Sequence, residues 1–233
     1  MTALTRRHCL VLAAAVPLAA CFEPGELSAR RAFITFLEQR VLSPQGLRVP
    51  RPTEDELTSF GRYAGHWEPL RVYHHEMETR LAPLLSNAGR ILPALRHPET
   101  WMNKVAEIAD SRRLLAVAME GTDELARRTE GEVARLAQPD DLKAVYARAF
   151  KKLVTDVTPV FRGGLEGLDG VLAAIADTGS FLVDHAGRFR FANGTIIWSD
   201  PALHARFQAK IAAIETARSR LAALHSALSA LRA

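Results

Sequence analysis

Apolar residues at helical spacing, in long segments divided by prolines, most constrain the fold of this chain. They recur every three to four residues, which favours amphipathic helices over strands. We expect helices over 26–42, 53–95, 99–137 and from about 140 onward. The loop at 43–52 holds three prolines and a glycine, a composition that ends helices. Such a pattern predicts long helices packed side by side.

Prolines and glycines within these segments predict where the helices start, bend or break. The sequence TEDE at 53–56 has the form of a capping box and would begin the second helix. Three prolines in that segment predict kinks or interruptions: Pro69, Pro83 and Pro93. Pro98 suits the first turn of the third helix. Four glycines over 163–170 should bend the fourth helix, because each weakens a helix by up to about 1 kcal/mol relative to alanine.

The hydrophobic period changes once, near residue 188. In the stretch GRFRFANGTIIW, large apolar and polar residues alternate around Asn193-Gly194, a strong signal for a two-residue hairpin turn. We expect strands near 188–192 and 195–198. The chain therefore predicts a mainly α fold, a long-helix bundle with one small β-hairpin before the C-terminal helix.

The C-terminal helix should begin after Ser199 or Asp200, with Pro201 in its first turn. Its apolar residues recur every seven positions in two rows, which predicts a seam against another helix. The rows are Phe207, Ile214, Leu221 and Leu228, and Leu203, Ala217, Leu224 and Leu231, with Lys210 interrupting the second.

The start of the chain has the features of an export signal. Two arginines precede an apolar run over 10–20, which is too short for a bilayer-spanning helix of about 20 apolar residues. The run ends in Leu-Ala-Ala-Cys at 18–21, which fits the bacterial lipobox. In that pathway the Cys21 thiol receives a diacylglyceryl group and the chain is cleaved between Ala20 and Cys21. The thiolate is the nucleophilic form of cysteine, which is why this residue type is required.

This pattern divides the chain into three parts. We expect a lipoprotein signal peptide over 1–20, a lipidated N-terminus and short tether over 21–25, and a single helical domain over 26–233 with its hairpin near 187–198. An ordinary signal peptide that happens to precede a cysteine is the alternative. The paired arginines also resemble a twin-arginine export motif, so the export route stays open.

Charge and cysteine content narrow the function of the mature chain. The net charge of +4 falls to +2 with the signal, which carries two arginines and no acidic residue. This near balance gives no reason to expect nucleic-acid binding. Cys9 leaves with the signal and Cys21 would carry lipid. No cysteine is then left for a disulfide, a thiolate metal site or a thiol nucleophile.

The sequence DTGS at 177–180 looks like the active-site turn of an aspartic protease. That chemistry needs two carboxylates that share a proton, each presented by a β-loop. The chain has one copy in a helical context, so Asp177 is not expected to be catalytic. We interpret the stretch as the frayed end of the fourth helix, with Gly179 near its cap.

The sequence HHEMETR at 74–80 invites comparison with zinc metalloproteases. Their motif requires a second histidine four residues after the first, and the chain has Thr79 there, so the motif fails. His74 and Glu78 remain a weak candidate metal pair at i,i+4. His66 lies two turns earlier on the same predicted helix, and the candidate distant ligands are His185 or His204. A solvated helix face is the preferred interpretation.

Other features have structural explanations. The glycines at 163–170 lack the lysine of a phosphate loop and instead favour a kink or a close helix contact. Three tryptophans fit a helical core: Trp67, Trp101 and Trp198. Three basic pairs are candidates for contact with anionic headgroups, although nearby acids favour a mixed solvated surface. They are Arg112-Arg113, Arg127-Arg128 and Lys151-Lys152.

Four stretches together resemble the YiaF-like bacterial lipoproteins. They are the lipobox Cys21-Phe22, RRAFITFLEQRV, DDLKAVYARAFKKLV, and FRFANGTIIW followed by a final helix. The resemblance runs in the same order over nearly the whole mature chain. It implies an uncharacterised envelope lipoprotein, and it supplies no catalytic residues.

We therefore expect a membrane-anchored bacterial envelope lipoprotein, a non-enzymatic interaction or structural module without a cofactor. Its partners would be the membrane, through N-terminal acyl chains, and an envelope protein. Phe22 rather than aspartate follows Cys21, which in enterobacterial-type sorting favours the periplasmic face of the outer membrane over the inner membrane. The alternative is a periplasmic protein that binds a small ligand or a metal between its helices.

Overall fold

The computed structural model describes residues 24–192 and 194–232 of the 233-residue chain, at some positions by their backbone alone. Those backbone-only positions are Pro24, Leu85, Ala88, Gly89, Ala94, Leu224, His225 and 227–232.

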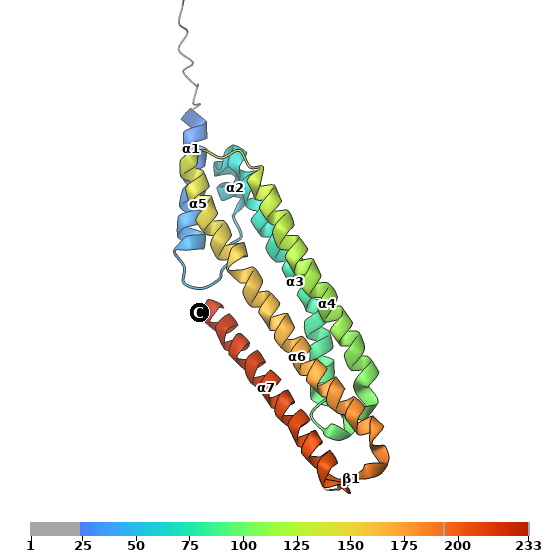
Figure 1. Cartoon of the computed structure of the whole chain (residues 1–233). Coiled ribbons are helices and arrows are strands. Elements are labelled where there is room, and N and C mark those ends of the chain that lie inside the picture. Colours follow the sequence, from blue (N-terminus) through green and yellow to red (C-terminus); the bar gives the residue numbers. More distant parts are fainter. Residues whose placement is uncertain (1–23, 193, 233) are drawn as a thin grey trace, which may run out of the picture.

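Over these residues, seven α-helices form an elongated bundle with a hairpin at one end (Figure 1). The α-helices are α1 (Pro24–Phe36), α2 (Glu54–Ser59), α3 (Glu68–Ala94), α4 (Pro98–Ala134), α5 (Asp140–Phe150), α6 (Val157–Asp184) and α7 (Pro201–Arg232). Two π-helical segments, η1 (Leu37–Leu42) and η3 (Lys151–Thr155), extend α1 and α5. Two 3₁₀ segments, η2 (Gly61–Trp67) and η4 (Ala186–Arg188), precede α3 and the hairpin.

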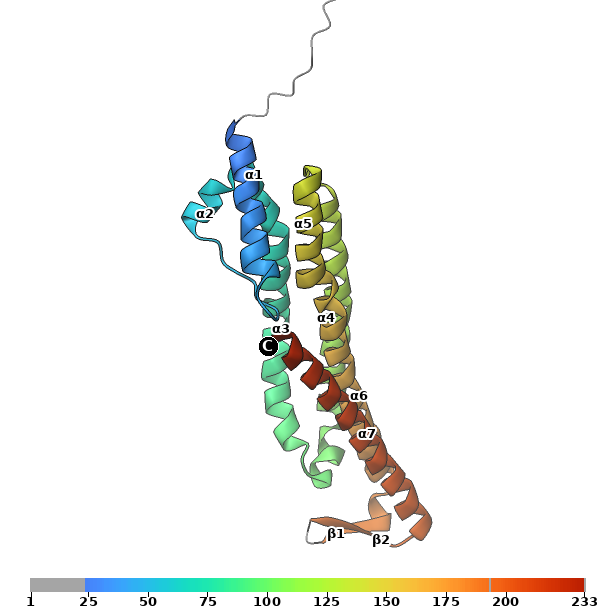
Figure 2. The ribbon, with the colours of Figure 1, turned by 90° about the vertical axis from the view of Figure 1, so that its left-hand side faces the viewer.

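The predicted fold class is confirmed. Strands β1 (Phe189–Ala192) and β2 (Thr195–Trp198) pair antiparallel, with Phe189 opposite Trp198 and Ala192 opposite Thr195. Gly194 has a φ of 74°, the left-handed conformation that a tight hairpin turn requires. A view turned by 90° shows the hairpin at the end of the bundle opposite α1 (Figure 2).

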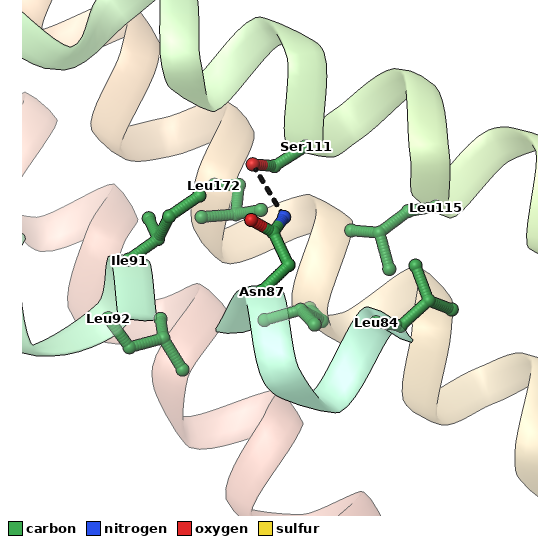
Figure 3. A pocket seen from close by; sticks show the side chains of 8 residues that line it. Leu84, Asn87, Ile91, Leu92, Ser111, Leu115 and Leu172 are labelled. Atoms are coloured by element: carbon green, nitrogen blue, oxygen red, sulfur yellow. Dashed lines mark hydrogen bonds between the residues drawn. The ribbon is translucent and has the colours of Figure 1, made fainter. Parts of the chain in front are cut away.

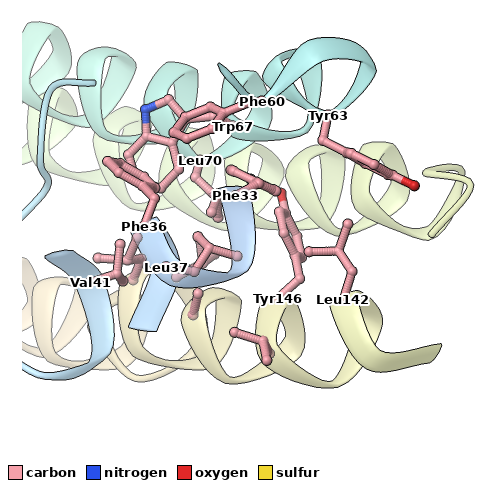
Figure 4. Close-up of a cluster of buried hydrophobic side chains, with 14 of the residues drawn as sticks. Phe33, Phe36, Leu37, Val41, Phe60, Tyr63, Trp67, Leu70, Leu142 and Tyr146 are labelled. Atoms are coloured by element: carbon pink, nitrogen blue, oxygen red, sulfur yellow. The ribbon is translucent and has the colours of Figure 1, made fainter. Parts of the chain in front are cut away.

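The buried residues at the α1 end form what we call the aromatic cluster (Figure 4). It joins α1, η1, η2, α3, α4, α5 and η3 around Phe33, which is fully buried and lies 5.1 Å from Phe60 between ring centroids. Its buried members are Ala29, Phe33, Phe36, Leu37, Val41, Phe60, Tyr63, Trp67, Leu70, Tyr73, Met77, Leu125, Leu142, Val145, Tyr146, Ala149, Leu153 and Val154.

The buried residues at the hairpin end form the aliphatic cluster, which lies between α3, α4, α6 and α7. Its members are Leu84, Ile91, Leu95, Trp101, Ile108, Leu115, Leu165, Val171, Leu172, Ile175, Phe181, Leu182, Leu203, Phe207 and Ile214. Phe189, Ile196 and Trp198 of the hairpin pack against it. The hairpin therefore closes this end of the core.

The second predicted helix is three elements rather than one. The capping box forms as predicted, because Thr53 Oγ1 accepts from Glu56 N at 3.1 Å and Glu56 Oε2 accepts from Thr53 N at 2.8 Å. That helix ends early, because Gly61 adopts a φ of 50°. Pro69 lies in the first turn of α3, where its missing N–H costs nothing. Pro83 and Pro93 lie inside α3, and neither proline interrupts this helix.

The fourth predicted helix was expected to bend at the glycines of 163–170, but it departs from α-helical geometry earlier in the chain. Regular helix gives way to the π-helical segment η3 at Lys151–Thr155, and α6 then runs through all four glycines at 163–170. Helical packing against α4 and α7 outweighs the weak intrinsic propensity of these glycines.

The seam of α7 is confirmed where its side chains are described. Leu203, Phe207 and Ile214 are buried, and Ala217 and Leu221 pack against the same cluster. Leu224, Leu228 and Leu231 belong to the predicted rows, but their side chains lie outside the described residues. Asp200 caps the helix, because its Oδ1 accepts from Ala202 N at 2.8 Å.

Candidate functional sites

The predicted lipidation and cleavage sites lie next to the start of α1. Residues 1–20, including Ala20, and Cys21 itself are outside the described residues. The described chain begins at Pro24, three residues beyond Cys21. From there to Arg232, apart from Asn193, no helix is both long enough and apolar enough to cross a membrane.

His74 and Glu78 lie one turn apart on α3 but in different surroundings. The His74 ring packs edge-on to Tyr73, with centroids 5.1 Å apart, and its Nε2 atom is buried without a hydrogen-bond partner among the described residues. Glu78 is exposed. His74 as a whole is half-buried, so the predicted solvated face is correct for Glu78 and holds only in part for His74.

Burial decides the protonation state of His74. It lowers the pKa of the imidazole from 6.5 to about 4, against the opposing effects of a hydrogen bond to the backbone of Leu153 and of the Glu78 carboxylate. Desolvation disfavours the charged ring, so His74 is neutral near pH 7. Neutral imidazole is the form that binds metal, yet the described residues bring together no group of three or more histidine, cysteine, aspartate or glutamate side chains able to hold an ion.

The other candidate histidine ligands each have a hydrogen-bonding partner. His66 Nδ1 lies 3.2 Å from Gln138 Nε2, and His204 Nε2 lies 3.1 Å from Gln208 Nε2. His185 Nδ1 lies 2.8 Å from the carbonyl oxygen of Phe181, in its own helix turn. The fold thus uses the rings of His185 and His204 in contacts within one helical turn and the ring of His66 in a contact with a distant segment, and the described residues do not group them into a metal site.

His74 contributes instead to a polar junction between α3 and η3. A π-helical segment departs from the regular i→i+4 hydrogen-bond pattern. Here the His74 ring bonds to the backbone of Leu153, and the Thr158 hydroxyl donates to the Val154 carbonyl at 2.7 Å. Tyr73 Oη lies 2.8 Å from Thr158 Oγ1. The sequence pattern did not predict this junction, because it contains no feature that indicates a π-helical segment there.

Asp177 and Gly179 have structural roles within α6. Asp177 is exposed and accepts a hydrogen bond from Lys210 of α7 at 2.5 Å. Gly179 is buried five residues before the end of the helix, so its predicted place near a frayed cap was wrong. A Cβ atom there would lie 2.8 Å from the Trp101 carbonyl oxygen. The glycine is needed because α4 and α6 touch at this point.

A small cavity lies between α3, α4 and α6 (Figure 3). Its volume is about 10 Å³, close to that of one water molecule. Asn87 Nδ2 donates to Ser111 Oγ at 3.0 Å within a lining of leucine and isoleucine. This cavity is too small for a ligand, since ligand pockets span about 300–1,000 Å³. Two more open hollows are larger, one of about 470 Å³ between α6 and α7 and one of about 330 Å³ between α4 and Asp169 of α6.

The buried hydroxyl groups do not converge on a shared site. Each one donates to a carbonyl four residues earlier in its own helix, at 2.7 to 2.9 Å. The four residues are Ser111, Thr122, Thr129 and Thr178. Their hydrogen-bonding capacity is thus used locally, and the core around them is apolar.

Comparison with known proteins places the chain in a family. The model of a family described as "Protein of unknown function (DUF3053)" matches residues 9–229. The chain belongs to this family. It is 25% identical over 184 residues to the uncharacterized protein YiaF of Escherichia coli K12, covering 77% of this chain and 75% of that protein. The YiaF protein of Shigella flexneri matches to the same extent. No solved structure matches.

The resemblance to YiaF-like proteins predicted from the sequence is thereby confirmed, while lipidation stays a prediction. The family description names no activity. Functional residues in this family member therefore have to be assigned from its own geometry.

The three basic pairs predicted as candidates for membrane contact are largely neutralised along the sides of the bundle. Arg112 Nε lies 2.8 Å from Asp169, and Arg113 pairs with Asp110. Arg128 pairs with Glu76, and Lys151 Nζ lies 2.5 Å from Asp156. Lys152 Nζ donates to the Pro44 carbonyl at 2.6 Å. This agrees with the preferred interpretation of a mixed solvated surface.

The tryptophans lie in the core as predicted. Trp101 and Trp67 are buried, and Trp101 Nε1 donates to the Leu95 carbonyl at 2.8 Å. Trp198 packs against Phe181, Phe189 and Phe207, with ring centroids 4.9 to 5.5 Å apart. They serve to pack helices and the hairpin together.

Proposed function

We propose that the protein is a lipid-anchored component of the bacterial envelope, acylated at Cys21, whose helical bundle acts as a structural or interaction module and not as an enzyme. The lipobox Leu18-Ala19-Ala20-Cys21 carries this proposal. The start of α1 at Pro24 agrees with it, because the described domain then begins three positions after the proposed acylation site.

The roles of the candidate catalytic residues support a non-enzymatic function. Asp177 pairs with Lys210, and Gly179 allows α4 and α6 to touch. His74 bonds to the backbone of a neighbouring helix. Each residue that invited a catalytic interpretation thus has a defined task in holding the bundle together.

The proposed location is the periplasmic face of the outer membrane, because Phe22 follows Cys21 where aspartate would favour inner-membrane retention. The proposed partner is another envelope protein. Crosslinking in intact cells, followed by mass spectrometry of the membrane-purified protein, tests this. One abundant and reproducible protein partner is expected, and recovery of background proteins alone would count against an interaction module.

Substitution of Cys21 by serine tests the anchor. The Cys21→Ser protein should lack acyl mass in intact-protein mass spectrometry and should be lost from salt-washed membranes, because the serine hydroxyl does not replace the thiolate nucleophile. Cys9→Ser is the matched control: it removes the other cysteine of the chain, outside the lipobox, and should keep both acylation and membrane retention. Unchanged fractionation of Cys21→Ser would contradict the proposal.

A further inference from the structure

We infer that the bundle meets the membrane through its α1 end, with Arg31, Arg62 and Arg135 against anionic lipid headgroups and with the hairpin held away from the bilayer. This inference rests on the proposed acylation of Cys21. It adds to that proposal an interaction surface and an orientation.

The length of chain between the anchor and the bundle sets the first constraint. Pro24, the first residue of α1, comes three positions after Cys21. A fully extended chain covers about 3.3–3.6 Å per residue, so this connection spans at most about 11 Å. The first turn of α1 is therefore held close to the headgroups.

Polar contacts place other segments at the level of these first turns. Arg30 lies 3.4 Å from Asp141 at the start of α5, and Tyr63 of η2 donates to Glu26. His66 of η2 lies beside Gln138, in the connection from α4 to α5. Figures 1 and 2 both show these segments at one end of the elongated bundle. We call this the anchor end, formed by α1, η2 and residues 135–141.

The anchor end carries arginines without acidic partners. Arg31, Arg62 and Arg135 are exposed, and none forms an ion pair with a described residue. Two of the acids there are already engaged, Glu26 with Tyr63 and Asp141 with Arg30. Asp140 is the acid that remains within the anchor end, and the exposed Glu54 and Asp55 lie in α2, which packs against α1 and η2. The unpaired positive charges of these arginines favour contact with anionic headgroups.

The sides of the bundle offer less of this attraction, because most of the basic pairs along α4 and η3 are held by acids. Arg112, Arg113, Arg128 and Lys151 each form an ion pair with a neighbouring carboxylate. The hairpin lies far from the anchor end. The 37 residues of α4 alone extend about 55 Å, and this helix runs from the anchor end towards the hairpin end of the bundle (Figure 1). An upright bundle thus presents the hairpin to the periplasm.

Depth-dependent quenching tests the orientation. In the acylated protein Cys9 is removed and the Cys21 sulfur is bonded to lipid, so one introduced cysteine can be labelled specifically. Ala137→Cys reports on the anchor end, Val117→Cys on the middle of α4, and Thr195→Cys on the hairpin; all three positions are exposed. The fluorophore-labelled proteins are placed in vesicles containing lipids with nitroxide headgroups.

Quenching should be strong at Ala137, weak at Val117 and absent at Thr195. Equal quenching at the three positions would mean that the bundle lies along the membrane, and this would overturn the inference while leaving acylation intact. Intact mass measured on the same samples separates the two proposals. A protein without acyl mass would instead refute the anchor itself.

Charge substitution tests the role of the arginines. Replacing phosphatidylcholine by anionic phosphatidylglycerol should increase quenching at Ala137 in the wild-type background. The increase should be lost in Arg31→Gln/Arg62→Gln/Arg135→Gln and kept in the matched triple Arg96→Gln/Arg190→Gln/Arg220→Gln. The control arginines are also exposed and without ion pairs among the described residues, but they lie outside the anchor end. Equal behaviour of the two triples, at unchanged helix content, would overturn the assignment.

Discussion

The two halves of the bundle bury different side chains. Seven of the residues in the aromatic cluster are aromatic, and most come from short elements around α1 and η2. The aliphatic cluster takes most of its members from leucine, isoleucine and valine on four long helices. The anchor end therefore depends on a few large rings, whereas the hairpin end depends on contacts repeated along helices.

Element length explains this difference. Short helices share little length with their neighbours, so large side chains have to bridge between them, as Phe33 does between Phe36, Phe60 and Tyr146. Long helices gain from close approach over many turns, and a small residue such as Gly179 permits it. The aromatic half should consequently be the more sensitive to loss of a single side chain.

Removal of the Phe33 ring should have the largest effect. Phe33→Ala deletes a fully buried side chain that contacts several other rings, and it should lower the free energy of unfolding by about 3–5 kcal/mol. Urea denaturation followed by circular dichroism measures the loss. Hydrogen exchange should show it first in α1, η2 and α5.

Phe207→Ala is the matched change in the aliphatic half. Phe207 is 6% exposed and lies near the start of α7, which contacts chiefly α6. This site can relax more readily, so the loss should be smaller than for Phe33→Ala. An equal or greater loss would refute the difference drawn between the halves.

Acid should weaken the fold through His74. Its pKa is about 4 in the folded protein against 6.5 for an ordinary histidine, so between these values the unfolded chain binds the proton more readily. Stability is thus lost as the pH falls below 6.5, and the loss is complete below about 4. A shift of this size corresponds to about 3 kcal/mol.

Comparison of variants isolates this contribution from the titration of carboxylates. The free energy of unfolding of His74→Gln should fall less than that of the wild type between pH 7 and pH 4. His75→Gln changes the exposed neighbouring residue and should follow the wild type. If all three proteins lose the same stability between pH 7 and pH 4, the half-buried His74 ring does not stay neutral over this range.

Features that depend on a regular hydrophobic repeat or on a short turn or cap motif were predictable from the sequence. The asparagine-glycine hairpin turn, the capping box at Thr53 and the α7 seam all depend on local chemistry, and each is present. The lipobox is a signal of the same kind, although Cys21 lies outside the described residues. The local sequence pattern was enough to predict a feature when residues close in sequence determine its structure.

Features decided by neighbours in space were missed. The π-helical geometry of η3 and the burial of His74 arise from packing between helices distant in sequence, and the local pattern contained neither. The glycines of α6 were predicted to bend it, yet tertiary contacts keep the helix continuous. The anchor-end arginines also appear as a group only after folding, because Arg31, Arg62 and Arg135 are far apart in the chain.

Substitution of two glycines of α6 should change the stability least, and it tests most selectively the close packing in the aliphatic half. A Cβ at residue 179 would meet the rigid Trp101 carbonyl at 2.8 Å and the Val105 Cγ2 atom at 3.1 Å, whereas one at residue 170 would meet nothing within 4 Å. Gly179→Ala should therefore cost about 1–3 kcal/mol, as overpacking does. Gly170→Ala should stabilise by about 0.5–1 kcal/mol through helix propensity alone.

Thermal unfolding of the two variants measures this contrast, since both place the same methyl group in the same helix. Stability changes of opposite sign in the two variants would show that contact with α4, and not helix propensity, requires glycine at position 179. An increase in stability in both variants would mean that α4 and α6 can move apart at residue 179 without loss of stability. The long-helix half would then lack the close contact that distinguishes it from the aromatic half.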